Sequence, residues 1–397
     1  MGFPSVLVLY IANLILFKSD VAVFIEIWAI INTIIVGVTT PLFTYAPNLR
    51  MEFGEDLHEF DNNFFIVSFI TGLLIILPVE VLILSCFSGI QTFSIFFAVS
   101  LFTVFSTSFN INNAYLISKG NYRRYFISTA RYFVVSSIGL LVLRPFGFST
   151  ISSVLYIFCL GLAIGSAESI FHSIANFTSV GFRAFVSTTR KLSSLSRLSI
   201  LVFISGVSNL ILNGPLIFGT RIGINADQLI TLGAFTNISL VFYSLLNSIT
   251  SPIQTEMIAN FHTHNFLKFK EIYWKYFVLY VCFTVIVSAF LSFAIEFLTK
   301  LYVDSSTDIN TAFRLIFVAS FGLSTISALP RIGLMMVGQY ASLLKIWFGG
   351  LSVFFVSLYI PFDPFSSVVV APTVSAVLIL VSCHLIFIKH VKLLAME

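Results

Sequence analysis

Long apolar segments separated by short polar connections make up almost the whole chain. A helix needs about 20 apolar residues to cross the hydrocarbon core of a bilayer, and longer helices tilt or extend beyond it. Most of these segments reach that length and carry few charges. The pattern predicts an all-α polytopic membrane protein of about 12 transmembrane helices, with spans at 4–17, 21–46, 63–87, 90–117, 125–147, 150–176, 198–219, 228–258, 272–298, 310–337, 341–360 and 366–388.

The composition agrees with this pattern and excludes several functions. Hydrophobic residues make up 58% of the 397 residues and charged residues only 10%, with a mean hydropathy of +1.01. A soluble domain carries about 25% charged residues. The net charge is only +4, and no basic patch is interleaved with aromatic residues. Nucleic-acid binding is therefore not expected.

The sequence lacks the common motifs of catalytic and metal-binding proteins. It contains no phosphate-binding Gly-x-x-x-x-Gly-Lys loop, no His-Glu-x-x-His and no Gly-x-Ser-x-Gly. Its four cysteines stand singly inside apolar segments, which is typical of packing residues. We therefore expect no enzyme activity, no cofactor and no metal site.

The distribution of Lys and Arg predicts the orientation in the membrane, because cytoplasmic connections are enriched in these residues. With the N-terminus in the cytoplasm, sixteen of the 21 Lys and Arg residues fall on the inner side and five on the outer side. The connection at 52–61 is acidic, but acidic residues contribute little to this rule. Both termini are therefore predicted to be cytoplasmic.

A basic segment near the middle divides the chain. It covers 177–197 and separates a predicted N-terminal lobe at 1–176 from a C-terminal lobe at 198–397, each with six spans. Its Ser, Thr and basic residues suit either an amphipathic linker on the inner leaflet or a simple solvated linker.

Short sequence echoes relate the two lobes. Gly120-Asn-Tyr122 follows the fourth span, and Gly338-Gln-Tyr340 follows the tenth. Thr39-Thr-Pro41 and Thr250-Ser-Pro252 also occupy equivalent places in the two halves. Matches in the same order indicate an internal repeat, which is typical of transporters built from two related lobes.

Polar residues inside the apolar segments predict one wall of a polar cavity. Asn209 and Asn213 are four residues apart and share one helix face. In the next segment, Asn237 and Asn247 belong to a polar stripe with helical spacing. Such stripes should face protein or water rather than lipid.

Taken together, the twelve spans, the cytoplasmic termini, the basic mid-chain linker, the short outer connections and the two Gly-x-Tyr turns resemble the Wzx-type O-antigen and polysaccharide flippases. These belong to the multidrug/oligosaccharidyl-lipid/polysaccharide (MOP) exporter superfamily. The resemblance implies a V-shaped bundle that carries an undecaprenyl-pyrophosphate-linked oligosaccharide across the bacterial inner membrane by alternating access. Its implied partners are this substrate and membrane lipid, with a polysaccharide polymerase and a chain-length regulator as candidates.

Two other classes compete with the flippase. An O-antigen polymerase has a similar size and composition but usually carries a large outer loop with catalytic arginines, and the sequence has no such loop. A drug/cation antiporter of the same superfamily would share the fold.

Charged residues inside the spans are candidates for the transport chemistry. Arg suits a pyrophosphate because its planar fork makes paired, charge-assisted hydrogen bonds. Arg131 and Arg331 lie in spans toward the cytoplasmic side and are expected to hold the pyrophosphate, although either can instead extend to lipid headgroups.

Acidic residues inside the spans are candidates for ion coupling. Glu80 and Glu168 lie deepest and are candidates to carry protons or Na⁺, with a structural ion pair or a neutral acid as the alternative. Glu26 and Glu296 lie near the outer ends of their spans and are expected at the membrane interface.

Overall fold

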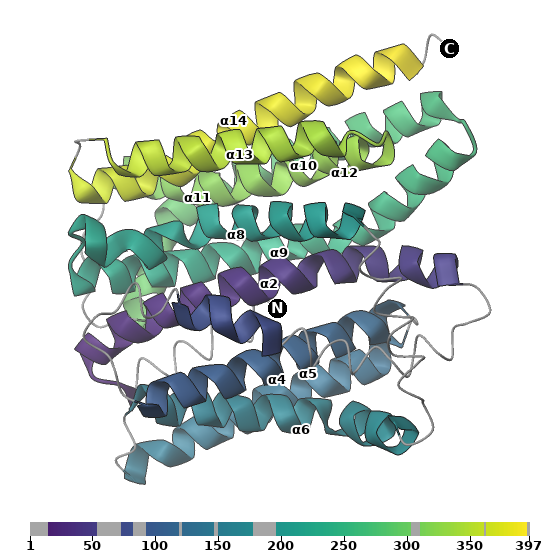
Figure 1. Cartoon of the computed structure of the whole chain (residues 1–397). Coiled ribbons are helices and arrows are strands. Elements are labelled where there is room, and N and C mark those ends of the chain that lie inside the picture. Colours follow the sequence, from purple (N-terminus) through teal and green to yellow (C-terminus); the bar gives the residue numbers. More distant parts are fainter. Residues whose placement is uncertain are drawn as a thin grey trace. The chain divides into compact units, whose positions relative to one another are not determined.

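The predicted membrane bundle is confirmed: eight of the described helices are long and apolar enough to cross a membrane. The computed structural model describes residues 15–53, 73–81, 93–118, 121–146, 150–177, 196–302, 310–360 and 363–394, and the segment 73–81 is helical. The labelled elements of Figure 1 are the helices α2 (Lys18–Phe53), α4 (Phe93–Ser118), α5 (Tyr122–Leu143), η2 (Arg144–Phe146), α6 (Ile151–Phe177), α8 (Ser196–Ile222), α9 (Ala226–His262), α10 (Phe266–Tyr302), α11 (Thr311–Ile326), α12 (Ala328–Met336), α13 (Tyr340–Leu358) and α14 (Pro364–Leu394).

Several predictions fall on residues outside the described ranges. These are nearly all of the first predicted span, most of the third and most of the basic linker. The contacts between Cα atoms group the described residues into two compact units, 15–209 and 210–394. We call them the N-terminal unit and the C-terminal unit. The boundary between the two units falls inside α8. The division into lobes at 1–176 and 198–397 stays a prediction from the sequence.

Polar residues just before the helices fix where many of them begin. An Asn, Asp, Ser or Thr at this position accepts a hydrogen bond from a backbone N–H of the first turn. Asn225 and Gln228 form a reciprocal capping box at the start of α9, with N···O distances of 2.9 and 3.2 Å. Asp363 accepts from Ser366 N at 3.0 Å before Pro364, the first residue of α14. Asn121, Thr150, Asn265 and Asn310 make the corresponding contact before α5, α6, α10 and α11.

The N-terminal unit is built around α6, which packs against both α4 and α5, while α2 packs on α4. Figure 1 shows α4, α5 and α6 side by side. Trp28 of α2 lies 5.4 Å from both Phe102 of α4 and Phe158 of α6, measured between ring centroids. This aromatic cluster joins three helices that are far apart in the sequence.

Close approach of α5 and α6 depends on two glycines of α6. A Cβ atom at Gly161 would lie 2.2 Å from Ser136 Oγ and 3.0 Å from Tyr132 O, and one at Gly165 would lie 3.0 Å from Ser128 O. The two glycines are four residues apart, so they form one small-residue strip of the kind that lets membrane helices pack tightly.

Hydroxyl and amide groups are buried along α4. Thr103, Thr107, Asn110 and Asn113 are each at most 4% exposed. Ser128 of α5 donates to Asn113 Oδ1 at 3.3 Å. The Oγ1 atoms of Thr103 and Thr107 have no hydrogen-bond partner among the described residues. The interior of this unit is therefore markedly polar.

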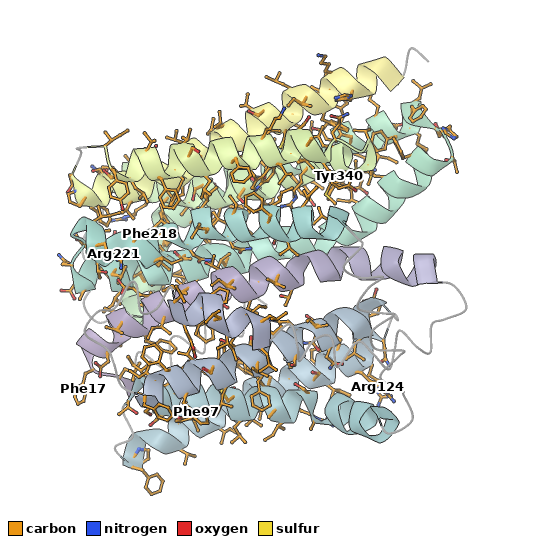
Figure 2. All side chains as sticks on the ribbon, viewed as in Figure 1. Phe17, Phe97, Arg124, Phe218, Arg221 and Tyr340 are labelled. Carbon is orange, nitrogen blue, oxygen red and sulfur yellow. The ribbon has the colours of Figure 1, made fainter. Side chains whose placement is uncertain are left out.

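The C-terminal unit is a layered bundle in which α11 packs against α9, α10 and α14, and α13 packs against α14. Tyr243 of α9 and Ser288 of α10 share a hydrogen bond of 2.8 Å in its core. The part of α8 that belongs to this unit packs on α13, where Phe218 lies 5.6 Å from Phe355 (Figure 2). Pro215 is accommodated inside α8.

The span predicted at 310–337 corresponds to one candidate span, Thr311–Met336, which consists of the two helices α11 and α12. Ser327 ends α11 and also caps α12. Pro330 is the third residue of α12, and a proline has no N–H and clashes with the carbonyl four residues earlier. Pro330 therefore explains why the helix is interrupted at Ser327, three residues earlier.

The two Gly-x-Tyr turns have the same backbone hydrogen bond. Asn121 N donates to Leu116 O and Gln339 N donates to Leu334 O, both at 2.9 Å. Gly338 has a φ of 75°, which favours glycine after the end of a helix. In each case Tyr is the first residue of the next helix, α5 or α13.

Candidate functional site

Two of the predicted cavity asparagines bond to their own helices. Asn209 Nδ2 donates to Ser205 O at 2.8 Å, and Asn237 Nδ2 donates to Gly233 O at 2.7 Å. Both side chains are half-buried, as is that of Asn213. One of the two N–H groups of each amide is used inside the helix, and the side-chain oxygen is an acceptor, which suits the hydroxyl groups of a sugar.

Two other predicted site residues have no described side chain. Asn247 lies on α9 and Glu168 on α6, as expected from the helical spacing, but both side chains lie outside the described part. Their roles remain predictions.

Arg331 is a half-buried cation in α12, directly after Pro330. Among the described residues, its guanidinium has neither a hydrogen-bond partner nor an ion-pair partner. It lies near the thiol of Cys383 of α14. A partly buried guanidinium is costly without an anion, so this position is suited to bind one.

An aromatic and histidine cluster lies between α10 and α14. Tyr273 Oη and His384 Nδ1 are 2.7 Å apart, which joins α10 to α14. The His384 ring stacks on Phe277 at a centroid distance of 4.6 Å, and Phe387 lies 4.3 Å from Tyr273. Phe387 of this cluster lies against Gly333 of α12, the helix that carries Arg331. Sequence reasoning missed the cluster, because the hydrogen bond joins residues 111 positions apart.

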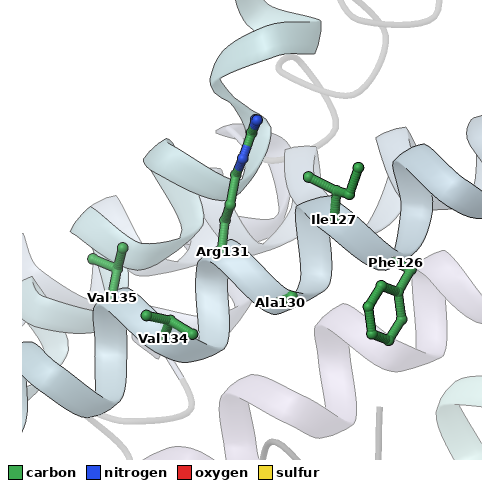
Figure 3. A pocket seen from close by; sticks show the side chains of 6 residues that line it. All are labelled: Phe126, Ile127, Ala130, Arg131, Val134 and Val135. Carbon is green, nitrogen blue, oxygen red and sulfur yellow. The ribbon is translucent and has the colours of Figure 1, made fainter.

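Arg131 lies on the exposed side of α5. With Phe126, Ile127, Ala130, Val134 and Val135 it lines an open cavity of about 310 Å³. Figure 3 shows the guanidinium extended away from the helix, with the two valines one turn further along. The structure therefore brings Arg131 into an apolar groove of its own unit.

Two acidic side chains of the N-terminal unit lie in different environments. Glu80 is half-buried and accepts a hydrogen bond from Ser100 of α4. Glu26, which was expected at the interface, is only 2% exposed. The sequence offered one signal for this burial, a single carboxylate inside the otherwise apolar run of α2.

Glu296 has partners on two sides, both in the C-terminal unit. Its carboxylate contacts Arg314 Nη1 of α11 at 2.5 Å and Lys300 Nζ at 2.8 Å. Glu296 is 33% exposed, whereas Arg314 is only 11% exposed. This ion-pair group joins the end of α10 to the start of α11 and gives both charges a structural role.

Comparisons with known proteins identify the fold. No protein-family model matches the chain, and no curated protein matches it. An inward-facing multidrug resistance MATE family transporter of the MOP superfamily aligns with a TM-score of 0.66 at 13% identity, over 100% of this chain and 96% of that one. An outward-facing structure of such a transporter gives 0.67 at 14% identity, over 99% and 94%.

A further solved structure gives the same result. A mutant of the Vibrio cholerae MATE transporter VcmN aligns with a TM-score of 0.68 at 11% identity, over 98% of this chain and 92% of that one. At these identities the likeness establishes a shared fold. The chain therefore has the helical fold of the MATE transporters of the MOP superfamily.

Proposed function

We propose that this protein is a membrane transporter that moves an undecaprenyl-pyrophosphate-linked oligosaccharide across the bacterial inner membrane. The single observation that carries the proposal is Arg331, a half-buried cation inside an apolar span that has no counter-ion among the described residues. A site for an anionic headgroup needs such a group. Both termini are proposed to be cytoplasmic, as the Lys and Arg distribution predicts.

The proposed mechanism is alternating access. A MATE transporter of this fold has been seen in inward-facing and outward-facing conformations. In our proposal, the pyrophosphate pairs with Arg331 of the C-terminal unit during transport. The acceptor oxygens of Asn209 and Asn237 bind sugar hydroxyls, together with Asn213 and Asn247. No step in this scheme breaks or forms a covalent bond.

Glu80 and Glu168 are the proposed coupling groups. Ser100 Oγ contacts both Glu80 and, at 2.8 Å, Phe96 O. Ser100 therefore holds the Glu80 carboxyl against α4. An intramembrane carboxyl in such a position is a candidate carrier of protons or Na⁺.

An antiporter of cationic drugs is the second candidate function. The buried Glu26 favours it, because a carboxylate that is only 2% exposed suits a cationic ligand or a proton. The two functions predict opposite signs for the charge of the transported group, and this difference is what the experiment tests.

The test replaces Arg331 in a strain that lacks the gene. Loss of one charge-assisted partner from a partly buried phosphate costs about 1.5–3 kcal/mol, or roughly 10- to 100-fold in transport. Surface polysaccharide should decrease in the order wild type, Arg331→Lys, Arg331→Gln, because Lys retains the charge but loses the fork. Lys345→Gln, which removes an exposed cation of α13, is the matched control and should restore polysaccharide fully.

Membrane levels of each variant are compared by immunoblot. Full restoration by Arg331→Gln would refute the role of Arg331. If the deletion strain keeps its surface polysaccharide but becomes sensitive to cationic dyes, the antiporter is correct. If the purified protein joins repeat units into chains, it is a polymerase.

A further inference from the structure

One helix of the N-terminal unit is covered far less than the others. In the apolar stretch of α5 that is long enough to cross a membrane, only 17% of the residues are buried. The corresponding value is 50% for α4 and 72% for α2. The buried strip of α5 contains Ser128, Ser136 and Leu140. The remaining faces present large apolar side chains, including Val134, which is 48% exposed, and Ile138, which is 57% exposed.

The charge on α5 is concentrated at one end. Arg124 extends from its first turn (Figure 2), and Arg131 follows seven residues later. Seven residues are close to two helical turns, so the two arginines share one face about 10 Å apart along the axis. The helix contains no acidic residue. Beyond Arg131, the same face continues only with apolar side chains, Val135, Ile138 and Val142.

The groove at Arg131 lies where the basic and apolar parts of this face meet. Its volume is about 310 Å³, and all its described lining residues belong to α5. Ala130 leaves space between the larger Phe126 and Val134 (Figure 3). A phosphate at the guanidinium would therefore place an attached chain directly over an apolar strip.

We propose that this face of α5 is a docking site for the polyprenyl carrier, with its phosphate at Arg131 and Arg124 and its isoprenoid chain along Val134, Ile138 and Val142. This inference rests on the proposed function and adds where the carrier lipid is held. The strip from Arg131 to Val142 is about 16 Å long at 1.5 Å per residue. This is close to half of the roughly 30 Å hydrocarbon core, so the strip covers one leaflet.

A polyprenyl phosphate fits the pattern of this face, because it joins one phosphate to one apolar chain, and the face has one basic end followed by one apolar strip. The arginine forks provide the charge complementarity that an anionic headgroup requires.

The second unit provides an internal comparison. α13 follows the matching Gly-x-Tyr turn, but the position nine residues after its Tyr is Gly349, where α5 has Arg131. Its exposed cation is Lys345, only five residues after the Tyr. A phosphate held at the depth of Arg131 therefore has no equivalent on α13, and the docking site is confined to the N-terminal unit.

The experiment measures lipid binding to the full chain in phosphatidylcholine nanodiscs. The probes are undecaprenyl phosphate, undecaprenol, which lacks the phosphate, and phosphatidylglycerol, and bound lipid is counted by native mass spectrometry. A photoreactive prenyl phosphate then identifies the labelled peptide. We expect undecaprenyl phosphate to bind in preference to both other lipids and to label α5.

Two variants test the charge and the shape of the groove separately, and a third variant serves as the control. Arg131→Gln removes the phosphate partner and should weaken binding by about 10-fold or more. Ala130→Trp fills the groove and should abolish labelling of α5 without changing the charge. Lys345→Gln should bind as wild type does. Size-exclusion profiles and helix content by circular dichroism verify that each variant is folded.

The outcomes distinguish this inference from the proposed function. Equal binding of phosphatidylglycerol, or of undecaprenol, would overturn the α5 site as a carrier site. If Arg331→Gln abolishes binding while Arg131→Gln and Ala130→Trp leave it unchanged, the carrier is held only at Arg331, so the inference fails and the proposed function stands. If wild-type protein binds no undecaprenyl phosphate, both fail.

Discussion

The contact between α5 and α6 can be tested by adding a single carbon atom. In Gly161→Ala the new Cβ would lie 2.2 Å from Ser136 Oγ and 3.0 Å from Tyr132 O. The serine hydroxyl can rotate, but the backbone carbonyl cannot move without shifting α5. Overpacking of this kind typically costs about 1–3 kcal/mol, and the better helix propensity of Ala returns up to about 1 kcal/mol. We expect a net loss of about 1–2 kcal/mol.

A matched control is present in the C-terminal unit. Gly349 lies inside α13, and a Cβ atom at this position would meet nothing within 4 Å. Gly349→Ala should therefore gain up to about 1 kcal/mol from helix propensity alone. Gly→Ala is therefore expected to lower stability at position 161 and to raise it at position 349. A general effect of replacing a membrane glycine would change both in the same direction.

Buried cysteines make the assay specific to each unit. Cys159 of α6 and Cys383 of α14 are both buried, so a thiol-reactive dye reaches each one only after its surroundings open. The purified protein is heated in detergent, and the labelled peptides are identified by mass spectrometry. At about 2–4 °C per kcal/mol for a unit of this size, Gly161→Ala should lower the labelling temperature of Cys159 by about 2–8 °C and leave Cys383 unchanged. An unchanged labelling temperature at Cys159, or equal shifts for both glycine variants, would refute the packing argument.

The remaining predictions concern a helix cap and an ion pair. Hydrogen bonds from the Ser366 hydroxyl and amide hold the pKa of Asp363 below its ordinary value, so its stabilising effect is present above that ordinary value and is lost as the pH falls through the lower pKa of the folded protein. Asp363→Ala should cost about 1 kcal/mol at neutral pH and much less at low pH, as measured by thermal unfolding. Asp363→Asn, which does not titrate, should be close to wild type at neutral pH and more stable than wild type at low pH. Arg314→Gln should lower stability by about 1 kcal/mol because Glu296 loses its less exposed partner, whereas Lys300→Gln should have almost no effect. Equal losses for the Arg314 and Lys300 variants would contradict this ranking.

The positions of the spans could be predicted because hydropathy and length depend only on local sequence. The spans expected at 341–360 and 366–388 correspond to α13 at Tyr340–Leu358 and α14 at Pro364–Leu394. The break at Ser327 could not be located in this way, because α11 and α12 are both apolar and a proline can either kink or end a helix. Pro215, which stays inside α8, shows the other outcome.

For the candidate site, the sequence predicted which residues share a helix face, but not which groups those residues contact. The spacing of Asn209 and Asn213 gave their shared face, but not the hydrogen bond that Asn209 makes to its own backbone. The partners of Glu296 and the burial of Glu26 depend on neighbouring helices, which a hydropathy profile does not represent. The sequence therefore marked the charged residues inside spans as candidates. Only the structure showed which partners a residue such as Glu296 has.

The buried polar strip of α4 has a consequence for how the protein enters the membrane. The spanning window of α4 has a mean hydropathy of 1.6, compared with 2.5 for that of α10. Thr103, Thr107, Asn110 and Asn113 are covered only after α4 has packed in its unit. During synthesis, α4 leaves the ribosome before α5 and α6 exist, so these groups would face lipid if α4 moved into the bilayer alone. We expect α4 to remain beside the translocon until α5 and α6 follow, so that the three helices enter the bilayer as a group.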